Sequence, residues 1–233
     1  MILKNLTFQT PEENLIYDDC LLHMTEKKSA GEFLRFWESA QTFIVLGRIG
    51  KAEKDVDEQK AQQDQVKVLR RSSGGGTVVQ GKGCLNYSFI LSKEKNKQLQ
   101  DIHKSYQYIL GAVIAALECL NIQCQYFPIS DIALSADQRK FSGNAQKRGR
   151  NFILHHGTLL YNFDLSLIDR YLKMPEDKPA YRQNRSHLDF VTNIAIDPNA
   201  FKQQLKQRFP ITKEEDQIGE EERLVMNNFL VTH

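Results

Sequence analysis

The chain has 233 residues, of which 41% are hydrophobic and 26% charged, and its 31 basic and 29 acidic residues give a formal charge of +2. This composition predicts an ordinary globular protein and excludes the broad cationic surface that nonspecific nucleic-acid binding requires. No run of about 18 consecutive apolar residues predicts a membrane span. Glu12, Glu13, Asp18 and Asp19 suit neither a secretory nor a mitochondrial presequence. We therefore expect a cytoplasmic protein that binds neither nucleic acid nor membrane.

The cysteines and the absence of internal repeats bear on metal chemistry and on domain organisation. Cys20, Cys84, Cys119 and Cys124 lie far apart without CxxC spacing, which disfavours a disulfide framework and a structural zinc site. No repeat, proline-rich linker or low-complexity tract divides the sequence. We predict a single domain over residues 1–233, without a metal site.

The first half of the chain predicts one helix followed by short strands. Residues 11–24 carry apolar side chains at helical spacing behind an acidic first turn, which favours a helix. Runs of β-branched and aromatic residues then predict strands. These runs cover residues 33–37, 42–47, 66–69, 77–79 and 85–91.

The second half predicts a long helix, further strands and shorter helices. Apolar residues recur with a 3.6-residue period over residues 101–120, the clearest helical pattern in the chain. The charged residues 213–223 are expected to form a solvated helix, or a helix and a turn. This order of elements indicates an α+β fold rather than a regular βαβ repeat. The other expected elements are strands at 132–134, 152–155 and 158–163, a short helix after Asp164, and a helix that begins at Pro198.

A glycine-rich loop is the first segment with a chemical signature. Arg70 and Arg71 lie directly before Ser72, Ser73 and the glycines at 74–76. Glycines allow backbone N–H groups to approach a ligand closely, and arginine offers a rigid fork of donors to an oxyanion. These residues alone leave phosphate binding and a flexible surface turn equally open. A P-loop is disfavoured, because no Lys-Ser or Lys-Thr pair follows the glycines.

Two further segments carry candidate groups. Lys140 is followed by small residues that predict a turn and by two amides. By itself this pattern favours an ordinary surface lysine, and the alternative is a lysine that neutralises a phosphate or polarises a carbonyl. His155 and His156 are adjacent at the start of a predicted strand. Because neighbouring side chains on a strand point to opposite faces, we expect a packed or hydrogen-bonded pair rather than two ligands of one metal.

Taken together and in this order, these segments resemble the lipoate-protein ligase family, within the superfamily of biotin and lipoate ligases and octanoyltransferases. The resemblance spans nearly the whole chain and rests on five ordered motifs. Arg182, Arg185 and residues 191–193 are similar, more loosely, to the arginine-containing closing segment of the family. The five motifs lie at residues 32–38 with 45–48, at 71–78, at 85–88, at 140–146 and at 156–160.

The resemblance implies a fold and an activity. The implied fold is a mixed, largely antiparallel β-sheet flanked by helices, with an acyl adenylate in a tunnel between the glycine loop and the lysine segment. The implied enzyme activates lipoate, or a related medium-chain acid, with ATP, while Mg2+ shields the triphosphate. It then transfers the acyl group to a lysine of an apo lipoyl domain, in a 2-oxoacid dehydrogenase complex or in the glycine cleavage H protein.

The same resemblance implies roles for individual residues. Lys140 is the implied catalytic residue, because its charge stabilises the oxygen that links the acyl group to phosphate in both half-reactions. Gly143, Asn144 and Gln146 are expected on the nucleotide side, and apolar strand residues such as Val79 and Leu159 along the acyl tunnel. The residues implied to bind the acyl adenylate are Arg71, Ser73, Gly74, Gly75, Gly76, Thr77, Val78, Asn86, Gly143, Asn144, Gln146, His156, Gly157 and Thr158.

The sequence departs from the family's pattern at three points. Gln80 stands where many relatives have a histidine, and Cys84 where an amide or small residue is common. The sequence also ends at residue 233 without the accessory C-terminal domain of the well-known bacterial ligases. We expect that another chain supplies that domain's function, or that it is dispensable, or that this enzyme does not form an adenylate.

Two alternatives to the ligase hypothesis therefore stay open. One is an octanoyltransferase that takes its acyl group from acyl carrier protein through a thioester on Cys124 or Cys84, with Lys140 or Arg71 lowering the thiol pKa. Against it, the favoured interpretation of both thiols is a buried, inert role. The other is a non-catalytic accessory subunit that binds lipoyl domains without turnover, which the presence of both Arg71 and Lys140 disfavours. The ligase is the leading hypothesis.

Overall fold

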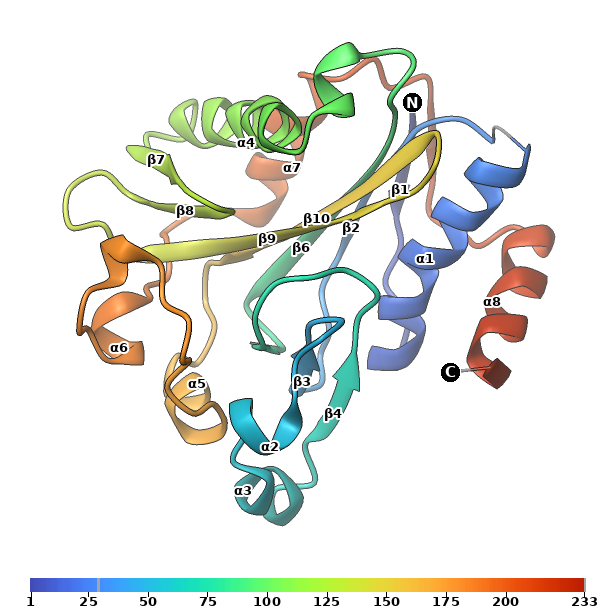
Figure 1. Cartoon of the computed structure of the whole chain (residues 1–233). Coiled ribbons are helices and arrows are strands. Elements are labelled where there is room, and N and C mark those ends of the chain that lie inside the picture. The colour runs from blue at the N-terminus through green and yellow to red at the C-terminus, as the bar shows by residue number, and fades with distance from the viewer. Residues whose placement is uncertain (29, 233) are drawn as a thin grey trace.

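The largest element of the computed structural model, which describes residues 1–28 and 30–232, is an eight-stranded sheet (Figure 1). Its strands lie in the order β11 (Lys213–Glu215), β1 (Ile2–Asn5), β2 (Phe33–Trp37), β6 (Cys84–Ser92), β10 (Phe152–Leu160), β9 (Lys140–Arg148), β8 (Asp131–Leu134) and β7 (Cys124–Phe127). β1 is parallel to β2 and to β11, and the other neighbouring pairs are antiparallel. The expected mixed, largely antiparallel sheet is confirmed.

A second sheet of three strands packs against one face of the large sheet. Its central strand is β3 (Phe43–Leu46), with β4 (Lys67–Arg70) parallel on one side and β5 (Val78–Gln80) antiparallel on the other. Ile44 pairs directly with Val79, and both join an apolar cluster that reaches the large sheet. The glycine loop runs from β4 to β5, so the small sheet fixes both ends of this loop.

Two helices cover the opposite face of the large sheet, α4 (Ile102–Glu118) and α7 (Pro198–Lys206) (Figure 1). The 3.6-residue pattern of the sequence is confirmed in α4, whose buried side chains form the main core together with the sheet. Asp101 caps α4 by accepting a hydrogen bond from the backbone N–H of Lys104. Asp197 caps α7 in the same way, with proline at the first helical position.

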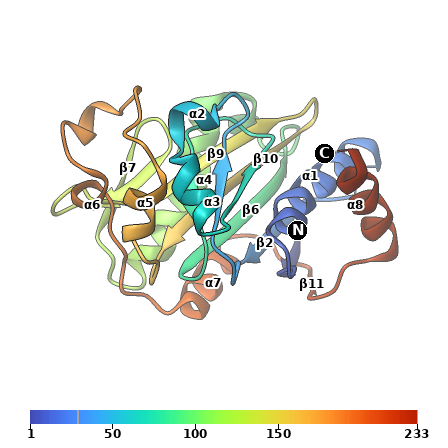
Figure 2. The ribbon, with the colours of Figure 1, turned by 90° about the horizontal axis from the view of Figure 1, so that it is seen from below.

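The remaining helices lie around the small sheet. Figure 2 shows α1 and α8 at one end of the molecule, α5 and α6 at the other, and α2 and α3 between them. None of the helices within residues 1–28 and 30–232 is long and apolar enough to cross a membrane. Their bounds are α1 (Pro11–Lys28), α2 (Ala52–Asp55), α3 (Glu58–Gln63), α5 (Ser166–Tyr171), α6 (His187–Phe190) and α8 (Glu220–Thr232), with single 3-10 turns η1 (Lys97–Gln100) and η2 (Ala180–Arg182).

The charged tail, residues 213–223, matches the predicted solvated helix, or helix and turn, only in part. Its first part is strand β11, which pairs in parallel with β1, and its last part is α8, which packs against α1. Lys4 of β1 is buried and forms ion pairs with Glu215 and Glu222. The Tyr17 hydroxyl of α1 donates a hydrogen bond of 2.6 Å to Glu222. Two acidic residues of the tail, Glu215 and Glu222, therefore serve as internal partners for a buried lysine.

The strands around the lysine motif also differ from expectation. The residues after Lys140, predicted to form a turn, continue as the nine-residue strand β9. Pairing with β8 on one side and β10 on the other overrides the weak strand propensity of Gly143, Asn144 and Ala145. The two strands predicted at 152–155 and 158–163 are one continuous strand, β10. The sequence pattern also gave no indication of the four-residue strands β1 and β7.

Candidate active site

A row of four residues crosses the middle of the large sheet from β6 to β8. Asn86 pairs with Thr158, Thr158 with Gly143, and Gly143 with Asp131. Side chains of directly opposed residues share one face of a sheet. His156 lies two residues before Thr158 on β10 and therefore shares this face, and its Nε2 lies 2.6 Å from the Ser73 Oγ. This is the face that the glycine loop covers.

The glycine loop leaves a run of backbone donors without partners. The N–H groups of residues 72–76 donate to no other group of the described chain. Buried or partly covered N–H groups are nearly always satisfied in proteins, and successive free N–H groups form concave sites for anions. The loop thus has the chemistry of an oxyanion site, and phosphate binding there stays a prediction.

Arg71 has different partners from those expected. Its guanidinium donates to the carbonyl oxygens of Gly74 and Gly76, at 2.6 and 2.8 Å, and to the Ser73 Oγ at 3.1 Å. Burial lowers the pKa of Arg71 to about 10, which leaves it charged at neutral pH. Arg71 therefore binds the loop itself. Because Arg71 donates to the Gly74 and Gly76 carbonyls, it stabilises the loop conformation in which the N–H groups of residues 72–76 have no partner.

Glycine is required where the loop meets the end of β3. A Cβ atom at Gly47 would lie 2.0 Å from the Gly75 carbonyl oxygen, closer than any real contact. Gly75 itself has a φ of +85°, which other residues rarely adopt. The Arg48 N–H donates to the Ser73 carbonyl at 2.8 Å and ties the two segments together. Steric contact therefore explains why Gly47 and Gly75 are glycines.

The two adjacent histidines occupy opposite faces, as expected. His156 meets Ser73 on the glycine-loop face, whereas His155 lies 3.1 Å from the Gln146 Nε2 on the α4 face. Burial lowers the pKa of His155 to about 3 and that of His156 to about 4. Both imidazoles are therefore neutral at pH 7, and they do not meet at one metal.

Lys140 reaches the glycine-loop face because of a β-bulge. In a regular strand, residues three apart point to opposite faces, so Lys140 and Gly143 would be separated. Between β8 and β9 the register shifts after Ile132, leaving Phe141 as an extra residue on β9. Lys140 thereby joins the face of Gly143, and a Cβ atom on Gly143 would lie only 3.1 Å from the Lys140 Nζ.

Not all residues of the lysine motif reach this face. Asn144 accepts a hydrogen bond of 2.6 Å from the Tyr87 hydroxyl and donates to the Ser130 carbonyl. Gln146 bonds to His155 and to Ser105 of α4. Both amides therefore lie on the α4 side of the sheet. Their contacts are with the core, in contrast to the nucleotide contacts that the resemblance implies.

Gly157 also belongs to this core arrangement. A Cβ atom at this position would lie 1.9 Å from the Asn144 Oδ1 and 2.5 Å from the Tyr87 ring. Any other residue would displace the Asn144 amide from its hydrogen bonds. The glycine of the histidine motif is thus explained by packing rather than by ligand contact.

Three polar side chains beside Gly143 form a closed hydrogen-bonded group. Gln80 Nε2 donates to the Thr158 Oγ1 at 2.8 Å, Thr158 donates to the Asn86 Oδ1 at 2.6 Å, and Asn86 donates to the Gln80 Oε1 at 3.2 Å. Asn86 and Thr158, expected in the site, are therefore together on its floor. Gln80, noted in the sequence only as a departure, completes the group.

The other expected site residues are dispersed. The Thr77 hydroxyl donates to Asp55 of α2 at 2.6 Å, and Val78 packs beside the buried strand β3. Val79 and Leu159, expected along one acyl tunnel, belong to different apolar clusters. Leu160, one residue later on β10, packs against the cluster of Val79 and is on the side that the tunnel hypothesis needs. The assignment of Leu159 is therefore corrected.

Neither candidate thiol has the environment of a nucleophile. Cys84 and Cys124 are both buried in apolar clusters. Burial, together with Glu118, raises the pKa of Cys124 to about 12, and burial raises the pKa of Cys84 as well. A reactive cysteine requires the opposite shift and an accessible sulfur. Lys140 and Arg71 do not lower the pKa of either thiol, contrary to that hypothesis.

Asp19 and Asp131 were missed by the sequence analysis. Asp19 of α1 accepts hydrogen bonds from the Ser72 hydroxyl at 2.5 Å and from the Lys147 ammonium at 2.8 Å, and so joins the glycine loop to β9. Asp131 accepts an ion pair of 2.8 Å from Lys140. Acidic residues within a helix, like Asp19, and at a strand start, like Asp131, are common surface features, so no signal in the sequence separated either residue from solvated carboxylates.

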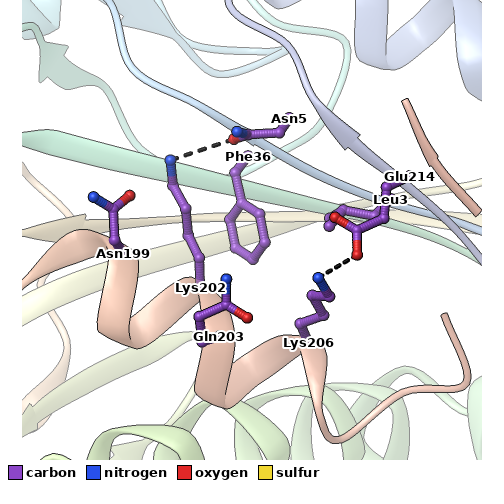
Figure 3. A pocket seen from close by; sticks show the side chains of 8 residues that line it. All are labelled: Leu3, Asn5, Phe36, Asn199, Lys202, Gln203, Lys206 and Glu214. Atoms are coloured by element: carbon purple, nitrogen blue, oxygen red, sulfur yellow. Dashed lines mark hydrogen bonds and ion pairs between the residues drawn. The ribbon is translucent and has the colours of Figure 1, made fainter. Parts of the chain in front are cut away.

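A small hollow elsewhere on the molecule lacks the features of this site. It lies between β1 and α7, on the other face of the large sheet (Figure 3). Its two lysines are already paired, Lys202 with the Asn5 Oδ1 and Lys206 with Glu214 (Figure 3). The face with the glycine loop and Lys140 is therefore the candidate active site.

Known proteins are similar to this chain over most of its length. A probable lipoate-protein ligase A of Mycoplasma pneumoniae is 28% identical over 184 residues, covering 79% of this chain and 52% of that protein. The chain spans about half the length of the curated relatives that it matches.

Solved structures share the fold. The bi-partite lipoate protein ligase of Thermoplasma acidophilum has a TM-score of 0.82 at 22% identity, and the match covers 99% of this chain and 93% of that one. A lipoate-protein ligase A bound with ATP has a TM-score of 0.81 at 22% identity, covering 98% and 93%. The family model described as "Lipoyl protein ligase A/B catalytic domain" matches residues 10–210. Because this match covers most of its length, the chain belongs to the lipoyl protein ligase A/B catalytic domain family.

Proposed function

We propose that the chain activates lipoate, or a related medium-chain acid, with ATP as the acyl adenylate and transfers the acyl group to a lysine of a lipoyl domain. The observation that carries this proposal is the placement of Lys140 on the same sheet face as the free N–H groups of residues 72–76. A cation and a row of backbone donors are the groups that carboxylate and phosphate oxygens require. Related structures are described as bound with ATP and with lipoic acid, which supports the choice of substrates.

In the first half-reaction, a carboxylate oxygen of the acid attacks the α-phosphorus of ATP. The bond from this phosphorus to the bridging oxygen breaks, pyrophosphate leaves, and the acyl adenylate forms. The transition state places negative charge on oxygens around the α-phosphorus. The Lys140 ammonium and the glycine-loop N–H groups stabilise that charge in a pre-organised site.

In the second half-reaction, the neutral amine of the acceptor lysine attacks the acyl carbon. The bond from this carbon to the AMP oxygen breaks, an amide forms, and the amine loses one proton. Lys140 stabilises the charge that develops on the departing AMP oxygen. Neutral His156 keeps Ser73, and with it the glycine loop, in place during both steps.

Mg2+ is proposed as part of the ATP substrate rather than as a resident ion. Within residues 1–28 and 30–232, no group of three His, Cys, Asp or Glu side chains is arranged to hold a metal. Mg2+ in nucleotide sites is commonly held by one or two carboxylates and mainly by the phosphates and water. The residues of this chain thus fit an ion that arrives with the triphosphate.

The proposed acceptors are apo lipoyl domains of 2-oxoacid dehydrogenase complexes or the glycine cleavage H protein. A related bi-partite ligase is described together with its E2 lipoyl domain, which supports this class of partner. A separate protein that supplies an accessory domain is proposed as a further partner, and the description of a related ligase as bi-partite supports it. Octanoyl transfer is the second candidate, which the raised pKa of Cys124 disfavours.

The test compares two acyl donors with the same apo lipoyl domain, read by intact mass of chain and acceptor. One reaction contains lipoate, ATP and Mg2+, and the other contains octanoyl-acyl carrier protein without ATP. We expect the acceptor to gain one lipoyl group in the first reaction only. Transfer from the carrier with an acyl adduct on the chain would establish the thioester enzyme instead. If the acceptor mass does not change in either reaction, even after addition of an accessory-domain protein, the proposal of acyl transfer is refuted.

A further inference from the structure

The side chain of Lys140 has one recorded partner, a carboxylate outside the motifs. Asp131 Oδ1 lies 2.8 Å from the Lys140 Nζ, and the Asp131 residue is only 6% exposed. Lys140 remains partly open, with 26% of its side chain exposed. From this arrangement we infer that Asp131 is the positioning residue for Lys140, and that Tyr181 holds Asp131 in this role. The inference rests on the function proposed above for Lys140.

The geometry leaves Lys140 free to bind substrate while it is held. An ammonium group has three N–H donors, and in the described residues the Asp131 carboxylate is the one group recorded within ion-pair distance. Two donors therefore remain for oxygens of the acyl adenylate. Gly143 lies beneath the end of the side chain, where any Cβ would come within 3.1 Å of the Nζ. Lys140 is thus confined between a carboxylate and bare backbone.

Asp131 is itself fixed by an aromatic residue from a distant segment. The Tyr181 hydroxyl donates a hydrogen bond of 2.7 Å to the second carboxylate oxygen, Oδ2. The Tyr181 ring stacks on Phe127 of β7 with 4.3 Å between ring centroids. Burial and the nearby Asp131 both raise the pKa of Tyr181, so that it stays a protonated donor. Each oxygen of the carboxylate therefore has its own donor.

The segment that carries Tyr181 also forms hydrogen bonds with the backbone at the start of β9, the strand that begins at Lys140. The Thr192 N–H donates to the Lys140 carbonyl at 2.9 Å. The Arg185 guanidinium donates to the Gln138 carbonyl at 3.2 Å, just before β9. Backbone and side chain of Lys140 are thus both fixed by contacts that include residues 181–192. The arginine-containing segment noted in the sequence therefore completes the site through Lys140.

The first test needs no enzymatic activity. It measures how fast a small amine-reactive acylating reagent labels Lys140, by peptide mass, in the wild type and in Asp131→Asn. Asparagine keeps an acceptor oxygen for Tyr181 but removes the charge that holds the ammonium. We expect labelling of Lys140 to be several-fold faster in the variant, with labelling of Lys147 unchanged as the internal control. Equal rates at Lys140 would overturn the inference, whether or not the chain proves to be a ligase.

The second test separates positioning from a structural role. We expect Asp131→Asn to lower kcat for acyl transfer about 10- to 100-fold, because a misplaced charge loses most of its effect, while KM for ATP and for the acid changes less than about threefold. Asp137→Asn is the matched control, since Asp137 is an exposed acid on the same hairpin that pairs with Arg139. Its kcat is expected to equal that of the wild type.

A double-mutant cycle provides the decisive comparison. In a Lys140→Ala background, Asp131→Asn is expected to cause no further loss, because the carboxylate acts only through the ammonium. Tyr181→Phe is expected to lower kcat about threefold to tenfold in the wild type and not at all in Lys140→Ala. An additional loss from Asp131→Asn in the absence of Lys140, or a wild-type kcat in its presence, would contradict the inference.

Discussion

Arg71 illustrates how a single side chain shapes a loop through contacts with the loop's own backbone. Its guanidinium occupies the carbonyls of Gly74 and Gly76, and the N–H groups of the same loop stay free. The sequence predicted that Arg71 and the glycines act together near phosphate. Which groups of the loop bind Arg71 and which stay free depends on the direction in which each peptide group points. That orientation follows from the close packing of Gly47 against Gly75, which no sequence pattern reports.

Substitution of Arg71 by lysine tests this role at constant charge. An ammonium group is not able to reproduce the planar fork that spans two carbonyls and Ser73. We predict that Arg71→Lys lowers kcat/KM for acyl transfer at least tenfold, measured under initial-rate conditions. Arg150→Lys is the matched control, because Arg150 is exposed and its guanidinium makes no recorded contact. An unchanged kcat/KM in Arg71→Lys would show that charge alone is sufficient.

For individual elements, pairing with neighbouring strands determines secondary structure more than the intrinsic propensity of the residues does. Helix α4 was predictable because its apolar periodicity matches the face that it buries, and strand β6 was predictable from its β-branched and aromatic residues, although all nine of its residues are buried. Strand β9 was read as a turn, since glycine, asparagine and alanine seldom predict strands, yet β8 and β10 pair with it on both sides. The bulge that brings Lys140 to the face of Gly143 is likewise a property of pairing register. The lysine motif therefore predicted where the site lies, but the position of the Lys140 side chain depends on the register between β8 and β9.

The docking of α1 on β2 depends on a buried ion pair. Arg35 is fully buried and donates to Asp18 of α1 at 2.7 Å. Removing one partner of such a pair leaves an unpaired buried charge. We predict that Arg35→Met lowers the free energy of unfolding by about 3–5 kcal/mol in guanidinium chloride titrations.

The control for this prediction is Arg223→Met on the exposed side of α8. Surface substitutions of this kind change stability by about 0.5 kcal/mol or less. A loss for Arg35→Met no larger than that of Arg223→Met would mean that packing around the arginine, rather than its charge, holds the helix.

At the scale of the whole molecule, the buried neutral histidines couple stability to pH. The folded pKa of His156 is about 4, whereas an unfolded histidine titrates near about 6.5. Between these values the unfolded chain binds more protons, so stability contributed by burying the neutral ring is lost as pH falls from about 6.5 towards 4. At higher pH this contribution is complete.

The prediction is a difference between two proteins in the same buffers. From pH 7 to pH 4.5, we expect the wild type to lose about 2–3 kcal/mol more unfolding free energy than His156→Gln. Carboxylates titrate in both proteins and cancel in the comparison. Parallel pH profiles of the two proteins would show that His156 is protonated in the folded state at pH 4.5.

The overall architecture shows how far sequence reasoning reaches. The family motifs implied a mixed sheet flanked by helices, and this is confirmed. The tail was predicted only in part: Lys213 and Glu214 are exposed, as expected of a solvated segment, but they form a strand that pairs with β1 at the sheet edge. The partner that makes Glu222 an internal residue is Lys4, 218 positions away in sequence. A pairing between residues so far apart in sequence follows from the fold and has no signal in the sequence.

The most direct test of the central claim is the rate of ATP-dependent lipoylation by Lys140→Ala, read by intact mass of an apo lipoyl domain. Lys104→Ala serves as the control, because Lys104 is an exposed lysine of α4, on the opposite face of the large sheet. The account predicts that Lys140→Ala loses at least about 100-fold in rate, the order expected for one missing charge-stabilising group, while its unfolding transition stays that of the wild type. Lipoylation by Lys140→Ala at the wild-type rate would contradict it.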